Sequence, residues 1–87
     1  MGQEDVRQSL EKLNVALERA EAADTAQKEA LDNLHADVQQ ALAAPENADG
    51  RSLLARLEAS LVHFGAEHPG LGLAVQEAIA ALSNAGV

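Results

Sequence analysis

Three histidines, His35, His63 and His68, are the side chains of this sequence that suit acid–base or metal chemistry near neutral pH. His63 and Glu67 are four residues apart, which places both on one face of a helix, and His68 follows directly. The spacing therefore offers a divalent metal ion a site with two or three ligands, taken from His63, Glu67 and His68. Zinc sites in proteins, however, generally use three or four ligands. We favour the simpler interpretation that His63 lies at a helix edge and that His68 is an N-cap, and we predict no cofactor.

Asp32 and His35 have the spacing of the Glu-x-x-His pairs that hold the metals of di-iron helical bundles. Such bundles use two of these pairs and two further glutamates that point inward. This sequence contains one pair, with Asp in place of Glu. A solvated helix face explains the spacing better, and we predict no metal site here.

Ser52 opens a helix candidate in an acidic chain, as the prosthetic-group serine does in acyl carrier proteins. In those proteins the serine stands in an Asp-Ser-Leu sequence, whereas here Arg51 precedes it and Asp49 lies three residues back. Serine at the start of a helix is commonly an N-cap or first-turn residue. An acyl-carrier-like or metal-binding four-helix module is thus the alternative function, with Ser52 or the histidine set described above as its site.

Motifs that activate a nucleophile are absent from the sequence. It contains no Cys, no Gly-x-Ser-x-Gly turn and no Gly-rich phosphate-binding loop. Lys12 and Lys28 are isolated among charged residues, and the Asp and Glu residues fit solvent-facing helix positions or caps. We therefore predict that the protein is not an enzyme and has no catalytic, cofactor-binding or metal-binding residues.

The charge of the chain narrows the range of partners. Fourteen acidic and six basic residues give a net charge of −8, which repels phosphate backbones and anionic lipid head groups. The single Phe and the lack of Trp and Tyr remove the aromatic platforms on which bases stack. The sequence shows neither a secretory signal pattern nor a charge-free run that is long enough to cross a bilayer. We expect a cytoplasmic protein whose partners are neither nucleic acids nor membranes.

Two apolar stripes in the first half predict amphipathic helices. The first stripe predicts a helix from Glu4 to Ala22, and the second predicts a helix that ends at Ala44, before Pro45. The stripes consist of Val6, Leu10, Leu13, Leu17 and Ala20, and of Leu31, Leu34, Val38 and Ala41 or Leu42.

The connection between these two stripes allows two structures. One seven-residue register runs from residue 6 to residue 41 without a break, as in a single long coiled-coil helix. Asp24 and Gln27, however, occupy two successive core positions of that register and have the spacing of an N-terminal capping box. We therefore favour a hairpin that turns near residues 22–25.

Turn-forming residues separate the two halves of the chain and also mark a helix boundary within the second half. Residues 45–50 read as a linker, and Asp49 or Ser52 is expected to cap the third helix. Pro69 suits the first position of a helix, where its missing N–H group leaves no bond unmade. We expect the last helix to begin there.

The last helix candidate, from Pro69 to Leu82, is the least polar part of the chain. Glu77 is its only charged residue, so apolar side chains face in nearly every direction and need cover on more than one side. Gly86 suits a left-handed C-cap beyond the helix.

The chain is thus predicted to be one all-α domain, residues 1–87, with four short helices. The predicted bundle consists of two antiparallel helical hairpins, 4–44 and 51–85, which are joined by a linker, 45–50. Because alanine buries little area, the core is thin, and small domains often gain the missing stability by oligomerising. We expect a homo-oligomer, a dimer, or a complex with another helical protein. The predicted packing or interface residues are Leu57, Leu61, Phe64, Leu71, Val75, Ile79 and Leu82.

Three segments of the second half have a combination of residues typical of one family: 52–54, 64–71 with its Phe-x-x-x-His-Pro motif, and 82–87. They resemble the small bacterial family catalogued as domain of unknown function 4404, whose chains have a similar length. The resemblance implies a shared fold and a bacterial origin, and it implies no activity, because the family has none established. Gly70 and Gly72 depart from the better helix formers that the family tends to carry, so we expect a weak start of the last helix.

Overall fold

The structure is a computed structural model that describes residues 2–44 and 49–86. Every regular element in these two ranges is a helix, which confirms the predicted all-α class with four helices. The helices are α1 (Gly2–Arg19), α2 (Thr25–Ala43), α3 (Gly50–Phe64) and α4 (Pro69–Asn84).

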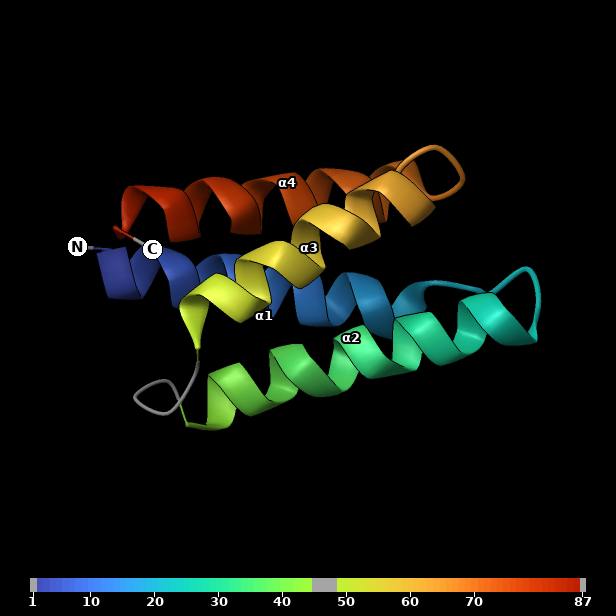
Figure 1. Cartoon of the computed structure of the whole chain (residues 1–87), viewed down its shortest axis with the longest axis horizontal. Helices are drawn as coiled ribbons and strands as arrows, with labels where there is room; N and C mark the ends of the chain where they lie inside the picture. Colours follow the sequence, from blue (N-terminus) through green and yellow to red (C-terminus); the bar gives the residue numbers. More distant parts are fainter. Residues whose placement is uncertain (1, 45–48, 87) are drawn as a thin grey trace.

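The four helices form a bundle in which each helix runs antiparallel to the next (Figure 1). Helices α1 and α2 form one hairpin, α3 and α4 form the other, and α2 also contacts α3. The ring closes between α1 and α4, which share the most extensive contact of the bundle. The whole measures 37 × 20 × 19 Å. The start of α1 and the end of α4 lie at the same end of the bundle (Figure 1).

The turn between α1 and α2 confirms the hairpin and shows that the single long helix is wrong. Asp24 is the N-cap of α2, and its carboxylate accepts a hydrogen bond from the backbone N–H of Gln27 at 2.8 Å. The Gln27 side chain accepts from the backbone N–H of Ala23 at 2.7 Å, one residue earlier than in a standard capping box. Helix α1 ends at Arg19 and not at Ala22, because the chain must leave the helix to bring Asp24 to the start of α2.

The second predicted boundary is only partly visible, because residues 45–48 of the predicted linker lie outside the described residues. Asp49 is the N-cap of α3, and Gly50 is already helical. The Asp49 carboxylate accepts hydrogen bonds from the backbone N–H groups of Arg51, at 3.1 Å, and Ser52, at 3.4 Å. Of the two predicted caps, Asp49 is therefore the one that fills the position.

The apolar stripes meet in one core along the axis of the bundle. Leu13, Val38, Leu57 and Val75, one from each helix, are completely buried. Full burial of such a side chain contributes about 1.5–3 kcal/mol. Helix α4 packs against both α1 and α3, so the nearly uncharged segment receives cover from two sides.

Gly72 lies where α3 and α4 approach each other closely, and the weak start of α4 expected from Gly70 and Gly72 stays a prediction. A Cβ atom at Gly72 would lie 3.1 Å from the Cα of Gly65 and 3.3 Å from its carbonyl oxygen. The helix begins at Pro69, as predicted, and His68 is the N-cap without a side-chain capping bond. Gly86 has a φ of 89°, the left-handed conformation expected beyond the end of α4.

Candidate functional site

The residues singled out as alternative metal ligands do not form one cluster. His63 is exposed on α3, whereas Glu67 and His68 lie in the turn between α3 and α4 and contact Gln27. Gln27 Nε2 donates to Glu67 Oε2 at 3.0 Å, and Gln27 Oε1 lies 3.2 Å from His68 Nε2. Within residues 2–44 and 49–86 no group of three His, Cys, Asp or Glu residues is placed to hold a metal ion.

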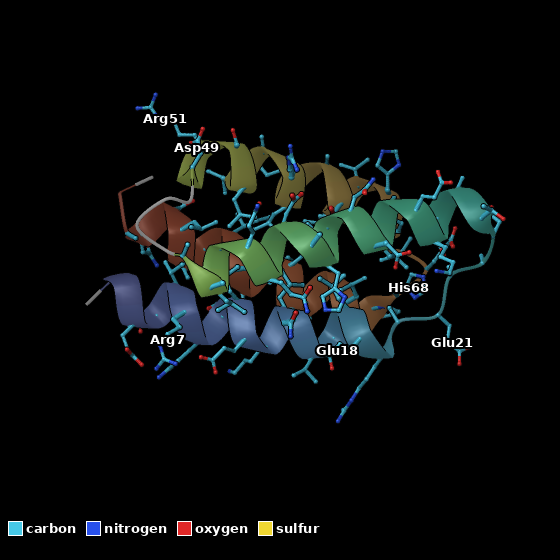
Figure 2. All side chains as sticks on the ribbon, turned by 90° about the horizontal axis from the view of Figure 1, so that it is seen from below. Arg7, Glu18, Glu21, Asp49, Arg51 and His68 are labelled. Carbon is cyan, nitrogen blue, oxygen red and sulfur yellow. The ribbon has the colours of Figure 1, made fainter. Side chains whose placement is uncertain are left out.

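These contacts tie together the two turns at one end of the bundle. Figure 2 shows His68 at this end, near the start of α2. The spacing of Asp24 and Gln27 predicts the cap, but it gives no sign that Gln27 also reaches a turn 40 residues further along the chain. The arrangement holds the two hairpins together and leaves Gln27 with a structural role.

Asp32 and His35 point to different surroundings. Asp32 accepts a hydrogen bond from Lys28 at 3.1 Å on an exposed face, as a solvated helix predicts. His35 departs from that interpretation: its side chain is only 25% exposed, and Nε2 lies 4.0 Å from Glu18 Oε1 on α1. Within the described chain, this Nε2 and Asn14 Oδ1 are buried atoms without a hydrogen-bond partner. They lie in the contact between α1 and α2, and the helical stripes give no sign of this.

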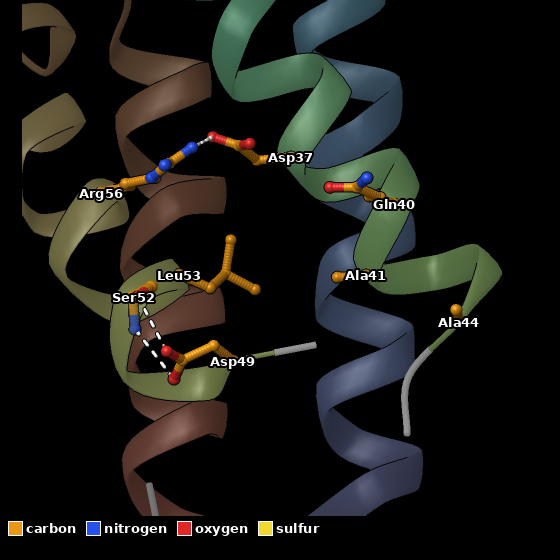
Figure 3. A pocket seen from close by; sticks show the side chains of 8 residues that line it. All are labelled: Asp37, Gln40, Ala41, Ala44, Asp49, Ser52, Leu53 and Arg56. Atoms are coloured by element: carbon orange, nitrogen blue, oxygen red, sulfur yellow. Dashed lines mark hydrogen bonds and ion pairs between the residues drawn. The ribbon is translucent and has the colours of Figure 1, made fainter. Parts of the chain in front are cut away.

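A pocket of about 420 Å³ lies between α2 and α3, next to the start of α3 (Figure 3). Arg56 of α3 reaches across it to form an ion pair with Asp37 of α2. The hydroxyl group of Ser52 donates to Asp49 at 2.9 Å, and this bond, followed by the Ser52 backbone N–H, lowers the pKa of the Asp49 carboxyl group. Asp37 and Arg56 are therefore paired with each other, Asp49 is engaged as the N-cap of α3, and Ser52 is engaged as a first-turn residue.

The surface between α3 and α4 has a different character, because it exposes large apolar side chains. Val62 is 84% exposed and Leu73 is 62% exposed. Both line a groove of about 470 Å³, which we call the α3–α4 groove. No charged residue of the described part of the chain lines this groove; its lining residues there are Leu61, Val62, Gly65, Ala66, Pro69, Gly72, Leu73 and Gln76.

The predicted packing or interface residues fall into two groups. Leu61 and Ile79 are half-buried, and Leu61 also lines the α3–α4 groove. The other five are buried in the core and have almost no surface to offer a partner: Leu57, Phe64, Leu71, Val75 and Leu82. Val62 and Leu73 were not predicted, because the apolar stripe identifies the side of a helix that faces the core and not the apolar residues left outside it.

Comparison with known proteins places the chain in a family. None of the helices in the two described ranges combines the length and the apolar character that crossing a membrane requires. No curated protein and no solved structure matches the chain. The family model described as "Domain of unknown function (DUF4404)" matches residues 6–87. Because this match includes both hairpins, the chain belongs to the DUF4404 family, as the resemblance of its second half indicated.

Proposed function

We propose that this protein is a non-enzymatic interaction module that forms a dimer with a second copy of itself through the α3–α4 groove. The observation that carries the proposal is the exposure of Val62 and Leu73 on one groove without charged lining. Single exposed apolar residues are normal on protein surfaces, whereas a contiguous apolar patch often marks a binding site.

The distribution of charge favours this face for contact between two acidic molecules. Residues 2–44 carry nine acidic and four basic residues, whereas residues 50–84 carry three acidic and two basic residues. Two copies with a net charge of −8 repel each other, and the repulsion is smallest where the meeting surfaces carry little charge. The face formed by α3 and α4 meets this condition better than the face formed by α1 and α2.

The shape of the groove suits a symmetric contact. Gly65 and Gly72 line the groove without side chains to fill it, and the exposed Val62 of α3 and Leu73 of α4 line it as well. In a two-fold dimer the same patch is used by both subunits. An apolar side chain of one subunit then enters the groove of the other, and the reverse contact follows by symmetry.

The balance of free energies, and not the area, predicts a weak dimer. A full face of the bundle measures 37 × 20 Å, which is roughly 740 Å², close to the ~800 Å² per partner of a standard interface. Burying Val62 and Leu73 of both subunits contributes roughly 4–8 kcal/mol. Association costs about 4–15 kcal/mol in lost freedom of motion. The rest of the α3–α4 face must therefore contribute, and dimerisation should depend on protein concentration.

Analytical ultracentrifugation over a range of concentrations tests this proposal. Leu73→Gln should raise the dissociation constant about 30-fold, because each subunit loses about 1 kcal/mol of apolar burial. Val15→Gln is the matched control, since Val15 is also a large exposed apolar residue, 44% exposed, but lies on α1. A wild-type protein that stays monomeric at millimolar concentration, or a Val15→Gln variant that weakens the dimer as much as Leu73→Gln, would refute the proposal.

A further inference from the structure

We propose that a second surface, a groove between α1 and α4, binds an acidic amphipathic helix of another protein. This α1–α4 groove has a volume of about 540 Å³ and lies on the other flank of α4 from the α3–α4 groove. Its lining includes Lys12, Val15 and Arg19 of α1, and Leu71 and Ala74 of α4. Among the described residues Pro69 alone lines both grooves, so the two proposals rest on different residues.

The two basic residues of the α1–α4 groove have no ion-pair partner among the residues that the structure describes. Lys12 and Arg19 have no carboxylate oxygen within 4.0 Å among the residues that the structure describes. Arg51 likewise has no carboxylate oxygen within 4.0 Å among those residues, but it points away from the bundle at the start of α3 (Figure 2). The ion pairs of the other basic residues are Arg7 with Glu4 and Glu11, Lys28 with Asp32, and Arg56 with Asp37. Of the three basic side chains without an ion pair inside the described ranges, two therefore lie on one groove, although the chain has 14 acidic residues.

The acidic side chain that lines the same groove, Glu67, lies more than 4.0 Å from the charged groups of Lys12 and Arg19. Glu67 accepts a hydrogen bond from Gln27 Nε2 at 3.0 Å, which holds its carboxylate toward α2. Lys12 and Arg19 are exposed and line the groove, so a partner that lies along it can reach both side chains. Opposite charges across an interface favour association and set the orientation of the partner.

The spacing of the two basic residues indicates a helical partner. Lys12 and Arg19 are seven residues apart on α1, which is two turns or about 10.5 Å along the axis. A second helix that lies alongside presents residues on one face with this same spacing. Two carboxylates seven residues apart can therefore meet both basic groups, whereas a fatty acid has one carboxylate and can meet only one.

The apolar part of the groove fits the side chain between those carboxylates. Val15 is 44% exposed midway between Lys12 and Arg19. Ala16 and Ala74 add small side chains to the surface, which allow the backbone of another helix to approach. The partner thus has an apolar residue flanked by acidic residues on one face. A nucleic acid offers negative charge without such a face.

Fluorescence anisotropy with the full chain and a labelled synthetic helical peptide tests the proposal. The peptide carries a leucine stripe flanked by glutamates seven residues apart, and a control peptide carries lysine at each glutamate position. Lys12→Gln and Arg19→Gln should each weaken binding of the acidic peptide about two- to fivefold. Arg51→Gln is the matched control, because it changes the net charge by the same amount, and it should leave binding unchanged.

The variants that test the dimer separate the two proposals. Val15→Gln should weaken binding of the acidic peptide and leave the dimer intact, whereas Leu73→Gln should do the reverse. The proposal of an acidic partner fails if the wild-type chain does not bind the acidic peptide, if it binds the lysine peptide equally well, or if Arg51→Gln weakens binding as much as Arg19→Gln. Circular dichroism of each variant verifies that the helices are intact.

Discussion

Replacing Gly72 by Ala tests whether α3 and α4 approach as closely as the structure places them. In an open helix position, Gly→Ala stabilises by about 0.5–1 kcal/mol because alanine loses less freedom on folding. At Gly72 the new Cβ atom meets the backbone of Gly65, 3.1 Å from Cα and 3.3 Å from the carbonyl oxygen. Backbone atoms cannot rotate away, so α3 and α4 must separate by a few tenths of an ångström.

The balance of these two effects gives the expected sign. Overpacking a tight contact costs about 1–3 kcal/mol, which exceeds the gain in helix propensity. We expect Gly72→Ala to destabilise the protein by about 1 kcal/mol, equivalent to a melting temperature about 4–8 °C lower for a domain of this size. Gly70 provides the matched control, because a Cβ atom there meets nothing within 4 Å.

Thermal and urea unfolding followed by circular dichroism measure both variants. Gly70→Ala should be as stable as the wild-type protein or up to about 1 kcal/mol more stable. Subtracting the unfolding free energies of the two variants cancels the gain in helix propensity, because both changes add one methyl group near the start of α4. If Gly72→Ala is as stable as Gly70→Ala, the close approach of the two helices is refuted.

Three further changes test the core, the cap and the contact between α1 and α2. Phe64 is 4% exposed, so Phe64→Ala should cost about 3–5 kcal/mol in urea unfolding, and a loss below about 1 kcal/mol would show that Phe64 does not anchor the core. Because folding lowers the pKa of Asp49, its contribution to stability is present above the unfolded pKa, about 3.9, and is lost as the pH falls through the folded pKa. In the Asp49→Asn variant the free energy of unfolding should therefore change less with pH below about pH 4 than in the wild-type protein. An unchanged pH dependence contradicts this role of Asp49. Asn14→Leu removes a buried acceptor that has no partner within the described residues; it should raise the unfolding free energy by up to about 1 kcal/mol, and a loss of that size would show that Oδ1 is satisfied.

The helices could be predicted because their signals are local. The apolar stripes of α1 and α2 repeat every three or four residues, and Asp24 interrupts the continuous register with a cap that the structure contains. Asp49 and Pro69 likewise mark helix starts through their own chemistry. Boundaries of this kind depend on a few neighbouring residues, so the sequence alone is sufficient to locate them.

The surface features could not be predicted because they depend on residues far apart in the chain. Val62 and Leu73 are apolar like the core residues beside them, and only the packing of α3 on α4 decides that they stay outside. The contact of Gln27 with Glu67 joins residues 40 positions apart. His35 is half-buried because α1 lies against it, which the sequence around His35 does not reveal.

The extensive contact between α1 and α4 has a consequence for the order of folding during synthesis. The ribosome releases the hairpin of α1 and α2 first. The surface of α1 that packs against α4 is then still uncovered, because α4 is synthesised last. Closing the long intervening loop adds only a little entropy cost compared with a shorter loop, because this cost grows with the logarithm of length. The flank of α1 that α4 covers therefore stays exposed to solvent until α4 has been synthesised.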